Sequence, residues 1–575
     1  MMALSISGCD KCADAVSPLS GGFSYGDAVS VDQLGRAVNP VSEQKSDKEV
    51  GLFYFLWNGQ HSRGNIYDIT KIFEKDPDIF WAENTPESPE TAFHYWSEPL
   101  FGYYDSSDMW VIRKQVEMLT WAQIDYLVFD TTNAGIYENV FMNLLSVLEE
   151  YRAEGWNVPK IVFYTNSYPK ETVQGIYNAL YGKNLYRDLW YIKDGKPMII
   201  SKASEIDAEM RAFFMVKETQ WPFGEEVANG YPWIDWRRPQ HMAYGLDGFD
   251  VVSVSVAQHP GLPMSNSVRY PEKYNDNWGR GYHNGANDPE AIDRGANFQE
   301  QWDTAIRMNP QTIFITGWNE WVAQKLPDGD SYMMVDQFNK EFSRDIEPMK
   351  GGFGDNYYLQ MIENIRKFKG ASADKKEVKK TAIKISGAFS QWDAVDYGYK
   401  DFKGDTADRK SASAAPELGD DYYTDTTGRN DFEELRVTYD SKNVYFLATT
   451  ARDITPNDNS GRWMNLFIGT QGLTQTGFEG YDYVINRTPR DSKTTSVEKS
   501  NGGYDWTDCG RAEYRVSGRY IHIAVPRSAL GITSDQFTVH FKWTDNITDP
   551  ADIMNCYTSG DAAPIGRLSY SFSVK

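Results

Sequence analysis

The chain has few cysteines, and their spacing excludes one common class of metal site. Only four are present, namely Cys9, Cys12, Cys509 and Cys556. No Cys-x-x-Cys pair faces a second such pair, which excludes a zinc ribbon. Cys509 and Cys556 fall in the last part of the chain. They could form a disulfide in an exported protein or stay as two buried thiols, and the sequence leaves both alternatives open.

Long apolar runs and an excess of positive charge are also absent. No run of about 18 apolar residues occurs, so no segment is predicted to span a membrane. The chain has 58 Lys and Arg against 81 Asp and Glu, a formal net charge of −23. Nucleic-acid binding needs clustered basic side chains, so we expect no nucleic-acid partner. A neutral or cationic ligand fits this charge better.

The predicted strands of the large domain lack three catalytic signatures. No Gly-x-Ser-x-Gly turn follows any of them to support a serine hydrolase triad, since the sequence GFSYG at residues 22–26 lies in the Ser/Gly/Ala-rich leader, and no Gly-rich phosphate turn follows the first predicted strand. No His-x-His or His-Glu-x-x-His spacing supports a catalytic metal. We therefore expect no cofactor, and histidines that bond substrate or scaffold. The five in the large domain are His61, His94, His241, His259 and His283.

Aromatic side chains, by contrast, are abundant. They make up 14% of the chain, with 18 Trp and 36 Tyr, which suits stacking on carbohydrate and also suits large aromatic cores. The 575 residues exceed what one hydrophobic core usually organises, so we predict at least two domains.

Residues 1–48 are predicted to be a leader and tether. The stretch Leu4–Cys9 (LSISGC) resembles the end of a bacterial lipoprotein signal, in which a small residue precedes a cysteine that receives lipid. The Ser/Gly/Ala-rich residues that follow suit a flexible tether. The prediction is an extracytoplasmic protein, either a cell-surface or periplasmic lipoprotein or a secreted one. Its membrane contact would be a lipid on Cys9, and the alternative is a disordered cytosolic tail.

Residues 49–370 alternate between buried-strand runs and amphipathic helices. Helical spacing occurs in Ser107–Gln123, Val140–Glu154 and Asn297–Met308. Eight strands with helices between them predict a (β/α)8 TIM barrel, and a doubly wound sheet is the alternative. The eight strand-like runs are Gly51–Trp57, Tyr126–Asp130, Lys160–Tyr164, Pro197–Ser201, Arg211–Val216, Tyr231–Asp235, Val251–Val256 and Thr312–Thr316.

The ends of these strands carry the candidate substrate contacts. In a TIM barrel the loops after the strands form the mouth, where function is found. Nearly every predicted strand end has side chains that can hydrogen-bond to a sugar or stack on it. The candidates are Trp57, His61, Asn133, Tyr164, Asn166, Trp221, Asp235, Gln258 and His259, with His94 and Trp96 from the long excursion after the first strand.

The stretch Thr312–Gln324 (TIFITGWNEWVAQ) is the strongest functional signal. A buried strand ends there in Trp318, Asn319, Glu320 and Trp321. Indoles stack on pyranose faces, an amide orients a hydroxyl, and a carboxylate transfers protons or stabilises positive charge at carbon. In the alternative interpretation both indoles are core residues and Glu320 caps a following helix.

A glycosidase of the two-carboxylate type needs a partner for Glu320. Asp130, Glu218 and Asp235 stand at predicted strand ends. Asp130 and Glu218 are preferred, because each follows an apolar run whose burial would raise a carboxyl pKa. Asp235 is expected to form a salt bridge with Arg237 or Arg238. The predicted catalytic residues are therefore Glu320, Asp130 and Glu218.

Several segments between residues 50 and 370 together resemble the glycoside hydrolase family 71/99-like barrels. They are the opening strand GLFYFLW, the His94-Tyr95-Trp96 loop followed by EPLFGYY, the helix that leads into Ala122–Asp125, and TGWNEW. Family 99 contains endo-α-mannosidases and endo-α-mannanases, and family 71 contains α-1,3-glucanases. The resemblance implies a barrel that cleaves glycans.

The family 99 pattern implies a role for Glu320 but lacks its second acid here. In that family Asn-Glu-Trp is followed by a second Glu three positions after the first. The first Glu acts as base on the sugar 2-hydroxyl, and the second acts as general acid/base. Glu320 matches the first position, and Ala323 stands at the second. The acid therefore comes from another strand end, or the barrel follows another stereochemical route, or it binds sugar without cleaving it.

Residues 371–380 are predicted to be a linker, and residues 381–575 an antiparallel β-sandwich of short alternating strands. Ile383–Gly387 before Trp392, the hairpin at Asn443–Tyr445, and Val525-Pro526 before Leu530 resemble family 9-like carbohydrate-binding modules. The domain could bind sugar or pack against the barrel. Aromatic candidates for a sugar cleft are Trp392, Tyr422, Tyr423, Trp463, Trp506 and Trp543.

Two functions follow from these observations. The preferred one is an exported glycoside hydrolase that cleaves a polysaccharide or glycan, and the rival is a non-catalytic surface glycan-binding protein. The enzyme requires Glu320 to face a cavity walled with indoles and opposed by another carboxylate. A Glu320 buried in a salt bridge would count against it. The sequence does not specify the sugar, its linkage or the oligomeric state.

Overall fold

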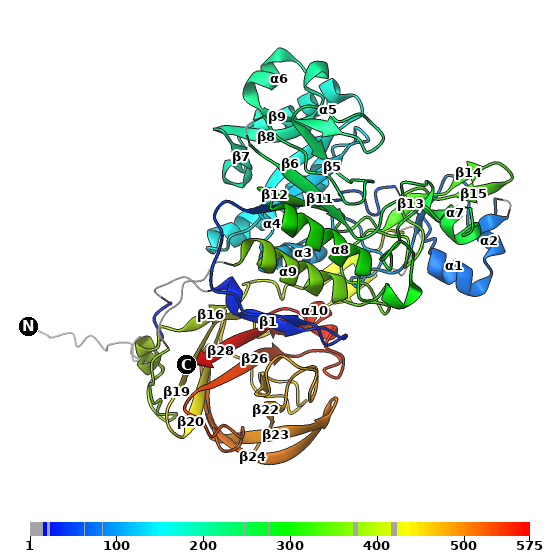
Figure 1. Cartoon of the computed structure of the whole chain (residues 1–575). Helices are drawn as coiled ribbons and strands as arrows, with labels where there is room; N and C mark the ends of the chain where they lie inside the picture. Colours follow the sequence, from blue (N-terminus) through cyan, green and yellow to red (C-terminus); the bar gives the residue numbers. More distant parts are fainter. Residues whose placement is uncertain are drawn as a thin grey trace, which may run out of the picture. The chain divides into compact units, whose positions relative to one another are not determined.

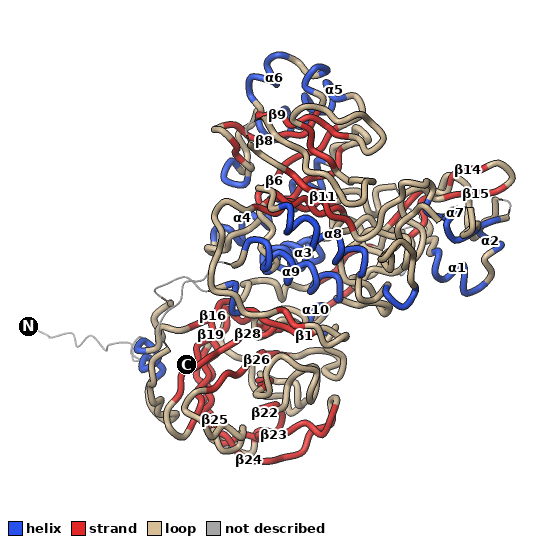
Figure 2. Tube along the Cα trace, in the orientation of Figure 1, coloured by secondary structure: helices blue, strands red, loops and turns tan. Residues whose placement is uncertain are grey.

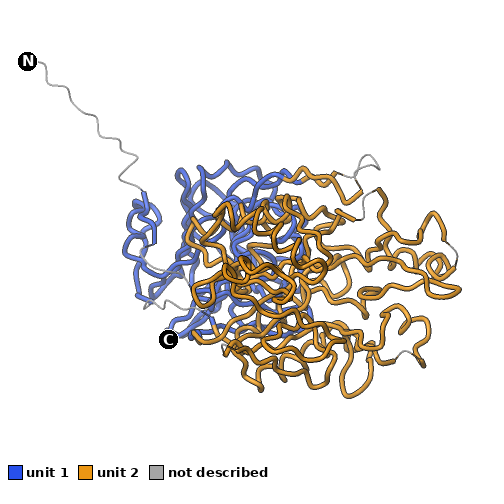
Figure 3. Tube along the Cα trace, turned by 90° about the horizontal axis from the view of Figure 1, so that it is seen from above, with its two compact units in different colours: residues 1–44, 371–408, 425–575 blue, residues 45–370, 409–424 orange. Residues whose placement is uncertain are grey.

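The computed structural model describes residues 15–19, 24–61, 64–82, 84–246, 248–273, 275–371, 378–415 and 422–575. They divide into two compact units (Figure 3). The barrel unit comprises residues 45–370 and 409–424, and the sheet unit comprises those within 1–44, 371–408 and 425–575. Cys9, Cys12 and the lipoprotein-like stretch Leu4–Cys9 lie outside the described residues. None of the described helices is both long and apolar enough to cross a lipid bilayer.

Eight parallel strands form the centre of the barrel unit (Figure 1). Their neighbour order is β10-β9-β8-β6-β5-β3-β12-β11, and β10 and β11 at its two ends lie near each other without pairing. The predicted TIM-type barrel is therefore confirmed in a nearly closed form. The strands are β3 (Glu49–Tyr54), β5 (Tyr126–Thr131), β6 (Lys160–Thr165), β8 (Lys196–Ser201), β9 (Met215–Gln220), β10 (Gly230–Pro232), β11 (Val251–Ser255) and β12 (Thr312–Thr316).

The barrel strands form where the sequence has continuous β-branched and aromatic runs. Every residue of β5, β11 and β12 is buried, as expected for parallel strands covered on both faces. β3 lies between β12 and β5, with Gly51 opposite Phe314 and Tyr126. A Cβ atom on Gly51 would lie 2.6 Å from the Tyr126 ring, so only glycine allows this close packing.

Helices follow most of the barrel strands. The three predicted helices are present as α3, α4 and α8. α3 begins after Asp108, whose side chain accepts a hydrogen bond from the Trp110 amide. The helices of the unit are α1 (Ile69–Lys75), α2 (Asp78–Trp81), α3 (Met109–Trp121), α4 (Glu138–Ala153), α5 (Pro169–Ile176), α6 (Ala208–Phe213), α7 (Met264–Arg269), α8 (Ala296–Met308) and α9 (Asn356–Lys369).

The fifth predicted strand, Arg211–Val216, is wrong. In the structure α6 occupies residues 208–213 and β9 begins at Met215. The apolar run Ala212–Val216 straddles the end of the helix and the start of the strand, so its composition does not reveal the boundary. As a consequence, Glu218 lies within a strand and not after its end.

Short strands and long loops make up the mouth-side excursions of the barrel unit (Figure 2). β13 follows Trp321 directly and pairs antiparallel with β4 from the first excursion, so Ala323 lies opposite His94. Glu320 therefore precedes a strand and caps no helix. These short elements are β4 (Phe93–Tyr95), β13 (Val322–Gln324), β14 (Leu326–Asp328) and β15 (Ser331–Met333), whereas β7 (Ile192–Lys193) pairs with the start of β8, at the other end of the barrel.

The sheet unit contains one large antiparallel sheet, which confirms that the last part of the chain is built of antiparallel strands. Its neighbour order is β16-β19-β20-β25-β24-β23-β22-β21-β26-β28-β1-β2. Its two free thiols are the exposed Cys509 and the buried Cys556. The strands are β16 (Gly398–Lys400), β19 (Phe432–Tyr439), β20 (Asn443–Thr450), β21 (Asn465–Gly469), β22 (Tyr483–Pro489), β23 (Thr494–Gly502), β24 (Asp505–Ser517), β25 (Tyr520–Pro526), β26 (Phe537–Asp545), β27 (Asp561–Ala563) and β28 (Ser569–Val574), with helix α10 (Asn555–Thr558).

The units differ from the predicted domains in two places. β1 (Ala28–Val31) and β2 (Ala37–Val38), from the predicted tether, extend the sheet, and Ala28 pairs with Tyr570 of β28. All four residues of β1 are buried, so this part of the chain belongs to a folded unit. β17 (Arg409–Ala412), which pairs with β18 (Tyr422–Asp425), belongs instead to the barrel unit. There Arg409 forms a 2.8 Å ion pair with Asp108.

Candidate functional site

A cavity of about 290 Å³ opens where the central barrel strands end. Trp57 follows β3, Asp130 is in the last part of β5, and Glu320 follows β12, so three neighbouring strands supply its wall. Asp336 comes from the long segment after β15. The remaining lining residues are His61, Phe93, Thr132, Asn133, Val322, Ala323, Gln324, Leu326 and Val335.

Glu320 is buried at the floor of this cavity. Its Oε2 accepts hydrogen bonds from Arg344 Nη2 at 2.5 Å and from Gln337 Nε2 at 2.8 Å. No hydrogen bond reaches Oε1 from the part of the chain that the structure describes. Burial raises the pKa of Glu320 to about 7, although the Arg344 charge opposes the shift. The salt bridge that would count against an enzyme is thus present, together with the cavity that an enzyme needs.

Arg344 connects Glu320 to a second carboxylate through His259. The Arg344 side chain is fully buried, and its Nη1 donates to His259 Nδ1 at 2.9 Å. A guanidinium only donates, so Nδ1 accepts, and the ring proton lies on Nε2. Nε2 is 3.2 Å from Asp336 Oδ1 and donates to it. Burial lowers the pKa of His259, in agreement with a neutral ring.

Asp336 is the most exposed of the acids in the cavity, with 41% of its side chain accessible. Burial raises its pKa, but the hydrogen bond from His259 and the charge of Arg344 outweigh this and lower the pKa to about 2. Asp336 is therefore ionised over the whole physiological range.

Asp130 also lines the cavity, as the sequence predicted, and both of its oxygens are occupied. Oδ2 accepts from Trp57 Nε1 at 3.1 Å. Oδ1 accepts from the Thr132 amide at 3.0 Å and from its hydroxyl at 2.7 Å. Burial raises the pKa of Asp130 against the effect of these hydrogen bonds. The carboxyl group holds the Trp57 ring in place.

Trp57, His61 and Asn133 form the aromatic and polar rim of the cavity. Trp57 meets the rings of His61 and Phe93 edge to face, with centroids 5.8 and 5.7 Å away. His61 Nε2 lies 2.8 Å from the Tyr137 hydroxyl, which also accepts from Asn133 Nδ2 at 2.9 Å. These three predicted contacts are therefore brought together.

A second aromatic group lies beside His259, after β9 and β10. Trp236 packs against the His259 ring at 5.1 Å, and Trp221 packs against Trp233 at 5.4 Å. Trp221 is 37% exposed, and Phe223, at 60%, lies against Trp236. Trp221 was predicted from its strand end, and the others were not. The group provides exposed rings next to the Arg344–His259 pair.

Glu218 and Asp235 do not line the cavity. Glu218 is half-buried within β9, and its Oε2 accepts from the Ala203 amide at 3.2 Å. Asp235 is in a salt bridge with Arg237, whose Nε is 2.9 Å away, and also accepts from the His241 amide. Glu218 is thus a structural carboxylate, and Asp235 has the salt bridge that its neighbours suggested.

The two indoles that flank Glu320 are core residues. Trp318 and Trp321 are fully buried, and Trp321 stacks on Trp96 at 4.7 Å. Asn319 clamps the chain after β3, since it accepts from the Phe55 amide at 2.9 Å and donates to the Phe55 carbonyl at 3.1 Å. Trp318, Asn319 and Trp321 therefore support the wall of the cavity from behind. Of the four residues Trp318–Trp321, Glu320 alone lines the cavity.

The other predicted contacts also lie away from the cavity. The His94 ring is buried between the Ser88 hydroxyl at 2.9 Å and the Ala92 carbonyl. Gln258 joins a buried amide network with Gln301 and Asn297. Tyr164 is buried in the barrel, where it donates to the Tyr231 carbonyl. Asn166 is half-buried after β6 and absent from the cavity lining.

A second buried carboxylate, Glu347, lies beneath the motif. It accepts hydrogen bonds from Gln115 Nε2, the Tyr104 hydroxyl and Trp321 Nε1, at 2.5, 2.8 and 2.5 Å. Burial raises its pKa to about 7. Because the pKa of Glu347 in the folded protein lies above its ordinary value of 4.5, the protonated carboxyl group stabilises the fold, fully so below pH 4.5. This stabilisation is lost as the pH rises through 7.

Glu347→Gln is therefore expected to remove one component of the pH dependence of stability. The free energy of unfolding of the wild type, minus that of the variant, should fall by about 3 kcal/mol between pH 4.5 and pH 8. Urea denaturation at both pH values measures this difference. A difference that does not change with pH would contradict a raised pKa at Glu347.

One group of acidic side chains could hold a cation. In the sheet unit, carboxylate oxygens of Asp405, Asp431 and Asp561 lie within 4.8 Å of one another. Carboxylates suit hard cations such as Ca²⁺. It is the one such group that the described residues form, and none of the histidines belongs to it.

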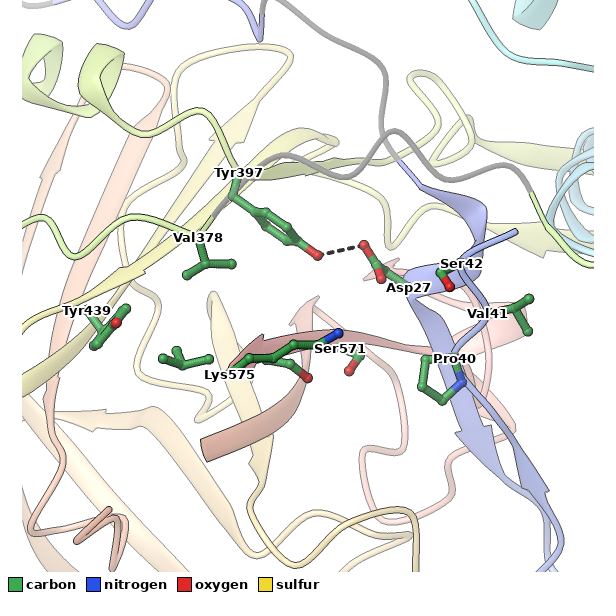
Figure 4. A pocket seen from close by; sticks show the side chains of 11 residues that line it. Asp27, Pro40, Val41, Ser42, Val378, Tyr397, Tyr439, Ser571 and Lys575 are labelled. Carbon is green, nitrogen blue, oxygen red and sulfur yellow. Dashed lines mark hydrogen bonds between the residues drawn. The ribbon is translucent and has the colours of Figure 1, made fainter. Parts of the chain in front are cut away.

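The sheet unit has a larger cavity, of about 550 Å³ (Figure 4). Tyr397 and Tyr439 line it, and the Tyr397 hydroxyl donates to Asp27 at 2.7 Å. Asp27 is the one acidic side chain among its described lining residues, so the cavity offers no pair of carboxylates. None of the predicted aromatic candidates of this part of the chain lines it; they are Trp392, Tyr422, Tyr423, Trp463, Trp506 and Trp543.

Three important residues of the candidate site were missed from the sequence, namely Asp336, Gln337 and Arg344. Asp336 and Gln337 interrupt an apolar stretch that runs from Met333 to Phe338. The available signal was the presence of two polar residues within an apolar run that belongs to no predicted strand or helix.

No family model and no curated protein matches the chain. Among solved structures, the chain is similar to the family 99 endo-α-mannosidase from Bacteroides thetaiotaomicron, with 16% identity over 56% of this chain and 98% of that one, and a TM-score of 0.32. The same enzyme in complex with bis-tris-propane has 16% identity over 56% of this chain and 97% of that one, with a TM-score of 0.33. A glycoside hydrolase-like protein has 13% identity over 57% of this chain and 96% of that one, with a TM-score of 0.31. At these TM-scores the likeness says nothing about the residues of the site.

Proposed function

We propose that the protein is a glycoside hydrolase that cleaves a polysaccharide or glycan in the barrel cavity. One observation carries the proposal: Glu320, Asp130 and Asp336 line a single cavity at the carboxyl ends of the barrel strands, beside the Trp57 indole. Hydrolysis of a glycosidic bond needs two carboxyl groups, and an indole offers a face to the sugar ring.

Glu320 is suited to donate a proton to the leaving oxygen. Arg344 and Gln337 both bond Oε2, so a proton on Glu320 is placed on Oε1. A pKa of about 7 keeps much of the group protonated near neutral pH, as a general acid requires. Hydrogen-bonding groups on the rim, from His61 and Asn133, can orient sugar hydroxyls.

Glycan binding without cleavage is the second candidate, and two observations favour it. Glu320 is in a buried ion pair with Arg344, and Ala323 stands where the resembling family has its second acid. A carboxylate locked by a guanidinium could serve only to shape the floor of the cavity.

A hydrolysis screen separates the two functions. The purified full-length protein is incubated with yeast α-mannan, α-1,3-glucan, dextran, starch and laminarin, and new reducing ends are measured. At least one polysaccharide should be cleaved, and Glu218→Gln should cleave it within about twofold of the wild-type rate, because Glu218 lies outside the cavity. Retention of a polysaccharide in affinity electrophoresis without release of reducing ends would favour binding alone.

A further inference from the structure

We propose that Asp336 is the second catalytic carboxylate of this site and acts as the nucleophile opposite Glu320. The inference rests on the proposed hydrolase function. Asp336 comes from the segment after β15, outside the strand ends from which the acids were predicted. Its side chain lines the same cavity as Glu320.

The hydrogen bonds of the two possible partners distinguish Asp336 from Asp130. Three donors from Trp57 and Thr132 occupy both oxygens of Asp130. In Asp336 the donors His259 and Arg344 both lie nearest to Oδ1, at 3.2 and 3.8 Å. No described residue donates to Oδ2, and the side chain is 41% exposed. Oδ2 of Asp336 is thus the carboxylate oxygen available to a sugar.

A single guanidinium links the two acids. Arg344 Nη2 is 2.5 Å from Glu320 Oε2, and Nη1 is 3.8 Å from Asp336 Oδ1. Because both contacts belong to one planar group, the nearest oxygens of the two acids lie no more than about 9 Å apart, a limit that includes the roughly 5–5.5 Å of retaining and much of the roughly 6.5–9.5 Å of inverting glycosidases. The geometry therefore allows both acids to act on one sugar.

The charge balance gives the two acids different states. Arg344 is the one cation in contact with both, and His259 is neutral, so a single positive charge compensates a single carboxylate. The pair titrates as a unit, with Asp336 ionised from about pH 2 and Glu320 losing its proton near pH 7. One ionised and one protonated carboxyl group is the starting state of retaining and inverting glycosidases alike, and the free Oδ2 of Asp336 is the oxygen that can act as a nucleophile.

Ala323 explains why a second acid is needed from another segment. It lines the cavity from β13 but carries no functional group. Asp336 reaches the same cavity from the segment after β15 and supplies a carboxylate there. The chemistry absent from the motif is thus provided from a different part of the chain.

The reaction proceeds in two balanced steps. Asp336 Oδ2 attacks the anomeric carbon and forms an ester bond, while the bond from that carbon to the glycosidic oxygen breaks and the leaving oxygen takes the proton of Glu320. Water then loses a proton to the Glu320 carboxylate and attacks the same carbon, and the ester bond to Asp336 breaks. Both acids return to their starting states with the anomeric configuration retained.

The test compares Asp336→Asn and Asp336→Gly with Asp130→Asn, the rival acid of the same cavity, and with the matched control Glu218→Gln outside the cavity. The substrate is the polysaccharide of the screen that the wild type cleaves fastest. Both Asp336 variants should lose roughly 10³-fold or more in kcat. Glu218→Gln should keep the wild-type rate within about twofold, and Asp130→Asn should lose less than either Asp336 variant, because Asp130 positions Trp57 and does not form the bond to the sugar. Thermal melts show whether each variant folds, and Asp336→Asn, which preserves the shape of the side chain, stands in if the glycine variant does not.

Chemical rescue identifies the nucleophile. Sodium azide should restore turnover to Asp336→Gly and yield a glycosyl azide, detected by mass spectrometry, since azide can attack the anomeric carbon while Glu320 still protonates the leaving oxygen. An Asp336→Asn variant with more than a tenth of the wild-type rate would overturn the inference and leave the hydrolase function intact. The same holds if Asp130→Gly alone is rescued. A wild type that cleaves nothing would overturn both.

Discussion

Replacement of Glu320 by glutamine is expected to lower the rate of glycan cleavage by roughly 10³-fold or more, with glycan affinity almost unchanged. The amide cannot transfer a proton to the leaving oxygen. Its carbonyl can still accept from Arg344 and Gln337, as Oε2 does in the wild type. The floor of the cavity therefore keeps its shape while the chemistry is lost.

Reducing-end release and affinity electrophoresis on the same preparation measure both effects, with Glu218→Gln as the matched control outside the cavity. The wild-type kcat/KM should fall as the pH rises through about 7, since Glu320 donates only while protonated and its pKa is about 7. A Glu320→Gln variant that keeps more than a tenth of the wild-type rate would remove this residue from the mechanism.

The barrel was predictable because its strands are covered on both faces. Such strands appear in a sequence as continuous apolar runs, and all eight predicted runs overlap a barrel strand, the fifth only at Met215 and Val216. The run Ala212–Val216 misled because α6 and β9 share it. Composition does not distinguish a helix from a strand within a few apolar residues. Here α6 ends and β9 begins within the same run.

The candidate site was only partly predictable, for a different reason. Glu320, Asp130, Trp57, His61 and Asn133 come directly from strand ends, where barrel geometry gathers side chains. Gln337 and Arg344 reach Glu320 from 17 and 24 residues further along the chain, out of the segment without regular structure that follows β15. No periodicity in the sequence reports where such a segment returns.

The indoles of the motif show a related limit. Trp318 and Trp321 have the residue type of a sugar platform, yet the structure buries both beneath the cavity. Burial depends on what packs over a residue, here Trp96 and Tyr358, from distant parts of the chain. The strand β1 was missed likewise, because its partner β28 lies at the opposite end of the sequence.

The Arg344→Met variant should have the largest effect on stability. The substitution leaves Glu320 buried without its cation, and removal of one partner of a buried ion pair costs about 3–5 kcal/mol. The loss should be greatest at high pH. Without Arg344 the pKa values of Glu320 and Asp336 both rise, and a carboxyl group with a raised pKa loses its stabilising contribution as the pH increases.

Urea denaturation of the barrel unit, followed by tryptophan fluorescence, measures the deficit at pH 5 and at pH 8. Trp233, which packs against the Arg344 guanidinium at 5.3 Å, is one of 18 tryptophans that contribute to the emission, so the signal follows unfolding of the whole protein. The double variant Arg344→Met with Glu320→Gln should be more stable at pH 8 than Arg344→Met alone, since the uncompensated charge is gone. A deficit of the same size at both pH values, unrelieved by the second substitution, would mean that Arg344 supports the fold through its packing.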